Sequence, residues 1–298
     1  MSSFTDKFRT SWELLRRSLQ VLQKNPKLYL FPVVSTLCAL AIALFFLAPI
    51  LAVLFANFWG AKAVTEADWD AVMARYNSAM YAYGVVIYLV SMFVGTFMNV
   101  AFYNEILRAL AGEPVSLRNG LRFASGRVVA ILLWSLLACT VGLIIRAIEE
   151  RLGWLGRIVM AMIGTAWSVA AVFAIPVIIR RTDNNPITVL RDSVGTLKRT
   201  WGESLAGFLG IQLGWLAFLA FSVGLLVPAG ILAFVLNQFW IGAAAGVLWL
   251  LAIFAASFFL SMATHVYRCA LYVYASEGVV PGPYTTDMMN AGWKVKKA

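Results

Sequence analysis

Two serines and a histidine in the last apolar stretch are the residues most suited to chemistry. Ser257, Ser261 and His265 are four residues apart, so an α-helix would place them along one face. A serine activated by a histidine is the nucleophile of many hydrolases. Nucleophile and base usually come from different elements, however, so that a substrate carbonyl fits between them. Hydrogen bonding between helices is therefore the favoured explanation, and a proton or ligand site at His265 is the alternative.

The sequence lacks the residues for metal or redox chemistry. His265 is the only histidine, and Cys38, Cys139 and Cys269 are far apart in or beside apolar runs. Paired-histidine haem ligation is impossible within such a chain, and a structural metal site would need more ligands. We interpret the cysteines as small buried hydrophobic residues. We expect no metal, no cofactor and no catalytic residue.

Four polar residues in or beside apolar stretches are candidates for a ligand cavity. Asn99, Asn104 and Glu105 lie at the end of the second stretch, and His265 lies in the last one. If those two helices are neighbours, the four side chains could share a cavity open to the cytoplasm. Polar groups within membrane helices often mark function. Packing and anchoring at the membrane interface is the favoured alternative.

The composition predicts that helices crossing a membrane position these residues. Apolar residues make up 61% of the 298 residues and charged residues 13%, against about half and about a quarter in soluble proteins. So little charge could not hydrate the whole surface of a soluble fold. We predict an all-α polytopic bundle that forms a single membrane domain over residues 1–298. Residues 1–27 are charged throughout, so we expect no cleavable signal peptide.

Stretches without charge predict six transmembrane helices. A span needs about 20 apolar residues, and the first four stretches that can provide one are 28–61, 76–104, 128–145 and 158–179. The fifth stretch, 204–267, would be roughly 96 Å long as one helix, about three times the hydrocarbon thickness. It must therefore fold back, with Pro228–Gly230 as the candidate kink and Asn237–Gln238 as the candidate turn.

The positions of Lys and Arg predict the orientation. With the N-terminus in the cytoplasm, the basic residues of the outer segments are only Lys62, Arg75, Arg146, Arg151 and Arg157 of 24. This bias predicts a multi-pass protein of the inner membrane with both termini cytoplasmic. The formal net charge of +10 then faces the cytoplasm, where we expect membrane lipids with anionic head groups as partners. We expect no nucleic acid, because the basic residues do not form a stripe on a soluble domain.

Three segments resemble one another. Residues 4–22 and 187–201 carry apolar residues every three or four positions, which is typical of a helix lying in the membrane interface. A Leu-Arg-x-small-apolar motif occurs at 15–19, 117–121 and 190–194, and Pro114 and Pro186 precede the last two copies. We predict repeats at approximately 4–108, 114–181 and 186–275, each an amphipathic interfacial helix followed by a transmembrane hairpin, and a cytoplasmic tail at 276–298. The predicted interfacial anchors are Trp12, Arg16, Arg17, Arg118, Arg191 and Trp201.

Glycine pairs predict close helix packing. Gly210 and Gly214, and Gly242 and Gly246, are each four residues apart, which lets helix backbones approach. Packing within the bundle is the favoured interpretation. Whether the chain also forms a homo-oligomer or binds a protein partner stays open.

The chain also resembles an uncharacterised family of bacterial six-span membrane proteins, a domain of unknown function. The residues that carry the resemblance are 140–153 (TVGLIIRAIEERLG), Gly156-Arg157, 164–168 (GTAWS), Pro176-Val177 and 199–204 (RTWGES), with 11–14 (SWEL) and 272–275 (YVYA). The resemblance implies a bacterial inner-membrane protein of unknown activity. It implies no catalytic residue and no substrate.

The favoured hypothesis is a non-enzymatic membrane component that organises lipids or proteins. A small transporter or permease for an apolar or amphipathic solute is the alternative, and an intramembrane hydrolase that depends on Ser261 is the third. The first hypothesis predicts that removing Trp12 and Trp201 disturbs membrane association or partner capture more than His265→Ala does, because these tryptophans would anchor the amphipathic helices. Co-sedimentation with membranes and co-purification of partners measure both effects. A larger effect of His265→Ala would favour the transporter.

Overall fold

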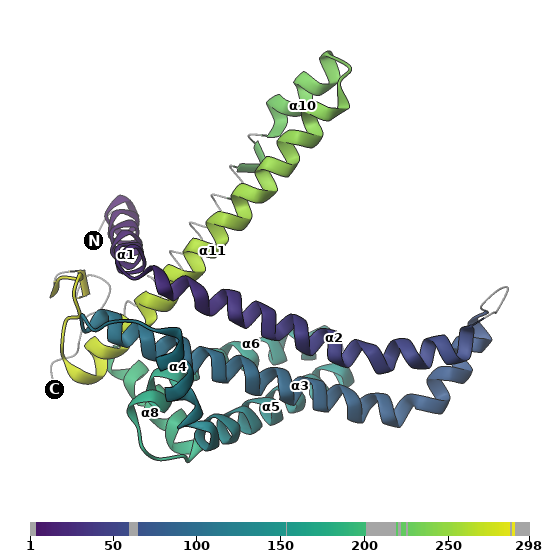
Figure 1. Cartoon of the computed structure of the whole chain (residues 1–298), viewed down its shortest axis with the longest axis horizontal. Coiled ribbons are helices and arrows are strands. Elements are labelled where there is room, and N and C mark those ends of the chain that lie inside the picture. Colours follow the sequence, from purple (N-terminus) through teal and green to yellow (C-terminus); the bar gives the residue numbers. More distant parts are fainter. Residues whose placement is uncertain are drawn as a thin grey trace. The chain divides into compact units, whose positions relative to one another are not determined.

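The computed structural model describes residues 4–59, 65–152, 154–200, 219, 222–224, 226–286 and 288–289 of the chain, and these contain helices and no strand. This confirms the predicted all-α class for the described residues. The helices, which Figure 1 labels, are α1 (Phe4–Lys24), a 3-10 helix (Pro26–Tyr29), α2 (Leu30–Phe58), α3 (Glu66–Leu110), α4 (Leu117–Ser125), α5 (Val128–Arg151), α6 (Trp154–Ala170), α7 (Ala174–Arg180), α8 (Pro186–Thr200), α10 (Leu226–Val235) and α11 (Phe239–Glu277).

Five described helical segments are long and apolar enough to cross a membrane, so the chain is a multi-pass membrane protein. They are Pro26–Phe58, Ala74–Leu110, Val128–Arg151, Gly156–Arg180 and Phe239–Glu277. A shorter apolar helix covers Ser222–Val235. Most of the stretch predicted to form the fifth of the six spans lies outside the described residues, together with Trp201, Gly210 and Gly214. The structure therefore shows five of the six predicted spans.

The chain forms two compact units. The first unit contains Met1–Pro26, Ile106–Val115 and Val194–Ala298, and the second contains Lys27–Glu105 and Ser116–Ser193. The helices α3 and α8 each contribute to both units.

In the second unit, neighbouring helices pack through aromatic rings. The Tyr83 hydroxyl of α3 donates to the Phe46 carbonyl of α2 at 2.8 Å, and the two rings lie 5.5 Å apart edge to face. The helices α5 and α6 also pack together, with the rings of Trp134 and Trp167 stacked 6.1 Å apart. Short connections favour such antiparallel neighbours.

In the first unit, α10 and α11 lie side by side and are joined by a tight turn (Figure 1). Asn237 has a left-handed backbone with φ of 52°, and Gln238 donates its N–H to the Ala233 carbonyl at 2.9 Å, which confirms the predicted turn. Pro228 lies inside the apolar helix Ser222–Val235, and the kink at Pro228–Gly230 stays a prediction. A Cβ on Gly242 would lie 3.5 Å from the Ala233 Cβ, so this glycine packs within the hairpin, whereas a Cβ on Gly246 would meet no described atom within 4 Å.

The fourth span is broken between α6 and α7. Pro176 lacks the N–H that would bond to the Val172 carbonyl, and its ring clashes with that carbonyl, so residues 171–173 form a turn. Ser193 of α8 fills the gap: its hydroxyl accepts the Phe173 N–H at 3.1 Å and donates to the Ala170 carbonyl at 2.6 Å. Because unbonded backbone groups are costly within a membrane, this hydroxyl both stabilises the break and holds α8 against it.

Ser193→Ala should lower the midpoint of thermal unfolding in detergent, followed by tryptophan fluorescence. The substitution leaves two backbone groups without their partner, which costs about 1–3 kcal/mol. Ser168→Ala is the matched control, because the exposed Ser168 hydroxyl donates to the Gly164 carbonyl of its own helix. Equal midpoints for the two variants would contradict a stabilising role for Ser193.

Candidate functional site

The three copies of the Leu-Arg-x-small-apolar motif share one pattern of exposure. The arginine is exposed and the small residue two positions later is buried, while the other three positions are half-buried. The arginines are Arg16, Arg118 and Arg191, and the small residues are Ser18, Gly120 and Ser193. These two positions are about 200° apart around a helix. Each helix therefore packs through its small residue and directs its arginine away from that contact. The threefold repeat itself stays a prediction.

In the first copy, Ser18 attaches α1 to the C-terminal segment. Its hydroxyl donates to the Leu14 carbonyl at 2.9 Å and lies 2.7 Å from the Tyr284 hydroxyl. Burial raises the pKa of Tyr284, so this phenol stays protonated. Tyr284 and Met289 are both buried. These two side chains therefore attach the described part of the predicted cytoplasmic tail to protein, although many of its other residues are exposed.

In the second copy, Gly120 permits a close approach that no other residue could make. A Cβ there would lie 2.7 Å from the Ala101 carbonyl oxygen, 2.9 Å from the Phe31 ring and 3.0 Å from Cγ of Glu105. The first of these contacts is with backbone, which cannot move aside. The helix α4 therefore lies directly against α3 at this glycine.

A fully buried carboxylate holds the N-terminal end of α4. Oε2 of Glu105 accepts the Ser116 N–H at 2.7 Å, and Oε1 accepts the side-chain amides of Asn104 at 3.0 Å and Asn119 at 3.4 Å. Ser116 is the N-cap of α4, and its own side chain makes no capping bond. The carboxylate thus caps the helix from α3, where the helix dipole favours a negative charge.

In the third copy, α8 has an N-terminal cap and, besides Ser193, a second attachment to the residues before it. Asn185 caps its N-terminal end by accepting the Ile187 N–H at 3.0 Å, and the helix begins at Pro186. Asp192 forms a salt bridge with Arg181, which directly follows α7. Asp192 and Asn119 occupy the same motif position, and both hold their helices in place.

The four predicted cavity residues have different environments. Asn104 and Glu105 are buried and bonded within the second unit, so their contacts are those of the packing alternative. Asn99 is exposed. His265 is half-buried in the first unit, on the same helix as the exposed Ser261. The shared cavity stays a prediction. Among the described residues, no three His, Cys, Asp or Glu side chains are arranged to hold a metal ion.

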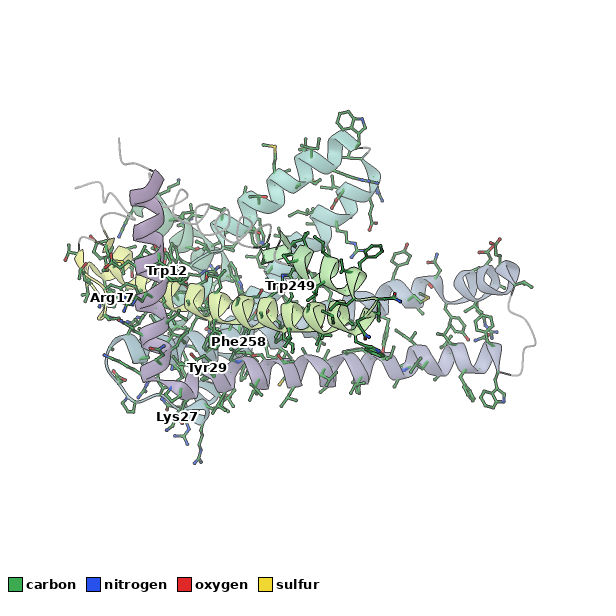
Figure 2. All side chains as sticks on the ribbon, turned by 90° about the horizontal axis from the view of Figure 1, so that it is seen from above. Trp12, Arg17, Lys27, Tyr29, Trp249 and Phe258 are labelled. Atoms are coloured by element: carbon green, nitrogen blue, oxygen red, sulfur yellow. The ribbon has the colours of Figure 1, made fainter. Side chains whose placement is uncertain are left out.

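The buried face of α1 overlaps its apolar stripe only in part. Leu14, Ser18 and Val21 are buried, and so is Leu22 of the stripe, whereas Trp12 of the stripe is 61% exposed and Leu15 is half-buried. The centres of the two faces are roughly a quarter turn apart at about 100° per residue. Trp12 and Arg17 both lie on α1 (Figure 2). The face with Ser18 thus packs on protein together with Leu22 of the stripe, while Trp12 stays exposed.

Sequence reasoning missed Asn119 and Tyr284. Nothing local distinguishes Asn119, because its role depends on Glu105, 14 residues earlier. Tyr284 is 266 residues away from Ser18, and it lies in a segment that we predicted to be a tail. In the sequence, the small residue of the repeated motif is the one signal that marks where α1, α4 and α8 attach to protein, at Ser18, Gly120 and Ser193.

Glu105→Ala should accelerate hydrogen exchange of the backbone amides of residues 116–120. The change removes the acceptor of the Ser116 N–H and loosens the attachment of α4, a loss on the order of 1–3 kcal/mol. Exchange is read by mass spectrometry of peptides from the purified protein. Glu149→Ala, at an exposed carboxylate on α5, is the control and should leave these amides unchanged. If the Ser116 amide exchanges as slowly in Glu105→Ala as in the unaltered protein, the carboxylate does not hold α4.

Comparison with known proteins identifies a family. The model of a family of unknown function, DUF6159, matches residues 78–282, about two thirds of the chain. The match covers the second and third copies of the motif, with Glu105, Gly120 and Ser193. No curated protein and no solved structure matches the chain.

Proposed function

The chain belongs to DUF6159, and we propose that it is a non-enzymatic component of the bacterial inner membrane that organises lipids with anionic head groups at the cytoplasmic face. The observation that carries the proposal is the repeated combination of a buried small residue with an exposed arginine on α1, α4 and α8. Each helix is held by hydrogen bonds or close packing on one face, while its arginine stays accessible.

The three arginines have the chemistry to bind phosphate. Within the described part of the chain, none of Arg16, Arg118 and Arg191 forms a salt bridge with a carboxylate. A guanidinium group binds phosphate oxygens through two parallel hydrogen bonds. Because each arginine is on an anchored helix, less conformational freedom is lost on binding than for a side chain on a free segment.

The order of the spans supports one common side for these helices. Two spans, α2 and α3, separate α1 from α4, and two more, α5 and the α6–α7 pair, separate α4 from α8. An even number of crossings returns the chain to the same side of the membrane. With the N-terminus in the cytoplasm, all three arginines then face the leaflet surface to which basic residues are attracted.

Exposed apolar surface supports contact with lipid near the same helices. The Trp12 side chain is exposed on α1 beside Arg16, a combination typical of helices in the membrane interface. Large apolar residues are also exposed along the spans, such as Phe45 on α2 and Phe254 on α11. Trp249 and Phe258 lie on the same helix as Phe254 (Figure 2). Hydrocarbon is the natural environment of such surfaces.

A transporter or permease for an amphipathic solute is the second candidate. The observation that favours it is Asn99, whose amide is exposed within the second span. An exposed amide in a span can also mark contact with a partner helix. The buried Asn104–Glu105 pair gives this candidate little support, because its hydrogen bonds hold α4.

Replacing Arg16, Arg118 and Arg191 with Gln together should reduce the retention of anionic lipid. The protein is placed in nanodiscs of mixed anionic and zwitterionic lipid, and the lipids that stay bound after extraction are identified by native mass spectrometry. Each arginine should contribute up to about 1 kcal/mol. The control variant replaces Arg75, Arg151 and Arg157, which are exposed residues of the predicted outer segments. Equal retention by both triple variants would overturn the proposal.

A further inference from the structure

A cavity of about 520 Å³ lies within the first unit. Its walls are the last turn of α1, the end of α3 with the turn that follows it, and Gly282 and Pro283 of the C-terminal segment. This volume is within the range of sites that bind small molecules. Val21 and Leu110 contribute buried apolar side chains, and Lys24, Asn25 and Glu113 contribute polar groups. The cavity therefore has the mixed lining that an amphipathic ligand needs.

Two charged side chains of opposite sign line this cavity. Lys24 is exposed and forms no ion pair with any described residue. Glu113, whose side chain is 54% exposed, places Oε2 at 3.3 Å from the Arg108 guanidinium. That salt bridge partly offsets the charges of both groups, and the exposed carboxylate still offers oxygen atoms at the cavity wall that can accept hydrogen bonds. The lining thus offers an ammonium group for an anion and a carboxylate for a cation.

The cavity also adjoins the C-terminal ends of two helices. At the end of α3, Gly112 has φ of +78° and donates its N–H to the Ala109 carbonyl at 3.1 Å, and Glu113 donates its N–H to the Arg108 carbonyl at 2.9 Å. This is a Schellman end, for which glycine is suited because it adopts the left-handed conformation without strain. The last carbonyls of α1 and α3 carry partial negative charge. Both helix ends therefore add to the attraction that Glu113 exerts on a cation.

We propose that this cavity binds a primary ammonium group linked to a phosphate, as in the head group of an aminophospholipid. The ammonium group lies against Glu113 and the two helix ends, and the phosphate lies against Lys24. The inference goes beyond the proposed function, because this head group pairs a cation with the phosphate anion and the site does not involve Arg16, Arg118 or Arg191. A quaternary ammonium fits less well, since it has no N–H to donate to the carboxylate or the carbonyls.

The same chemistry has two sources, a membrane lipid or a free aminoalkyl phosphate. The full chain is placed in nanodiscs of phosphatidylethanolamine and phosphatidylcholine in equal amounts, and native mass spectrometry identifies the lipid that stays bound. In parallel, soluble phosphoethanolamine is added to the protein in detergent, and hydrogen exchange is followed at residues 109–113. Retention of phosphatidylethanolamine identifies the lipid, and protection by phosphoethanolamine alone identifies the free compound. Both outcomes support the site, and the absence of both overturns it.

Variants separate the carboxylate from the salt bridge. Glu113→Gln should reduce retention of phosphatidylethanolamine about three- to tenfold, because an amide replaces the charged acceptor at a partly exposed position. Arg108→Gln breaks the same salt bridge but keeps the carboxylate, so retention should persist. Glu13→Gln, at an exposed residue of α1 outside the cavity, is the charge-matched control. Equal loss in Glu113→Gln and Arg108→Gln would assign the effect to the bridge and overturn the site.

The two proposals fail separately in these experiments. If the Arg16, Arg118 and Arg191 variant retains anionic lipid normally while Glu113→Gln loses phosphatidylethanolamine, the cavity stands and the proposed function falls. If the arginine variant loses anionic lipid while the unaltered protein shows no preference for the primary amine, the proposed function stands and the cavity site falls.

Discussion

Within hydrocarbon, every backbone N–H and C=O group must find its partner inside the protein, and this constraint governs the structure. Regular helices satisfy it within themselves, which is why the spans can expose apolar side chains such as Phe45 and Phe254 on their surfaces. Difficulties arise only where a helix ends or breaks. The turn at residues 171–173 is such a place, and Ser193 supplies both the donor and the acceptor that the backbone lacks there.

The three amphipathic helices are attached by different chemistry at equivalent motif positions. Ser18 uses a hydroxyl contact with Tyr284, Gly120 uses the absence of a side chain, and Ser193 bonds to a broken helix. What these positions share is a small residue, because only a small residue lets the helix backbone come close enough to its support. A substitution that kept the polarity but enlarged the side chain would therefore be unfavourable at each position.

Much of the fold follows from local rules that can be applied to the sequence. Charge-free stretches located the five described spans, and Asn237–Gln238 located the turn before α11. Arg146 and Glu150, which are four residues apart on α5, form a salt bridge at 3.1 Å, as this spacing on a helix favours. In each case the interacting residues are near one another in the chain.

The attachment points could not be predicted fully, because they depend on residues distant in the chain. Glu105 was a plausible cavity residue from its polarity alone, and only the position of Ser116 shows that it caps α4. The apolar stripe of α1 is buried at Leu22 and exposed at Trp12, and the helix also packs through the neighbouring face that contains Ser18. A stripe shows which face avoids water, and it does not distinguish lipid from protein as the partner.

The distribution of polar groups links the structure to the proposed role. Glu105 and Ser193 are engaged with backbone groups, and Asp192 with Arg181, so these side chains hold helices in place. The exposed charges of the repeated motif are arginines, and none of these three forms a salt bridge within the described part of the chain. A basic surface on firmly attached helices costs little conformational entropy when it binds an anionic leaflet. The combination of buried polar groups that attach the helices and exposed arginines on the same helices therefore supports the proposed lipid-organising role.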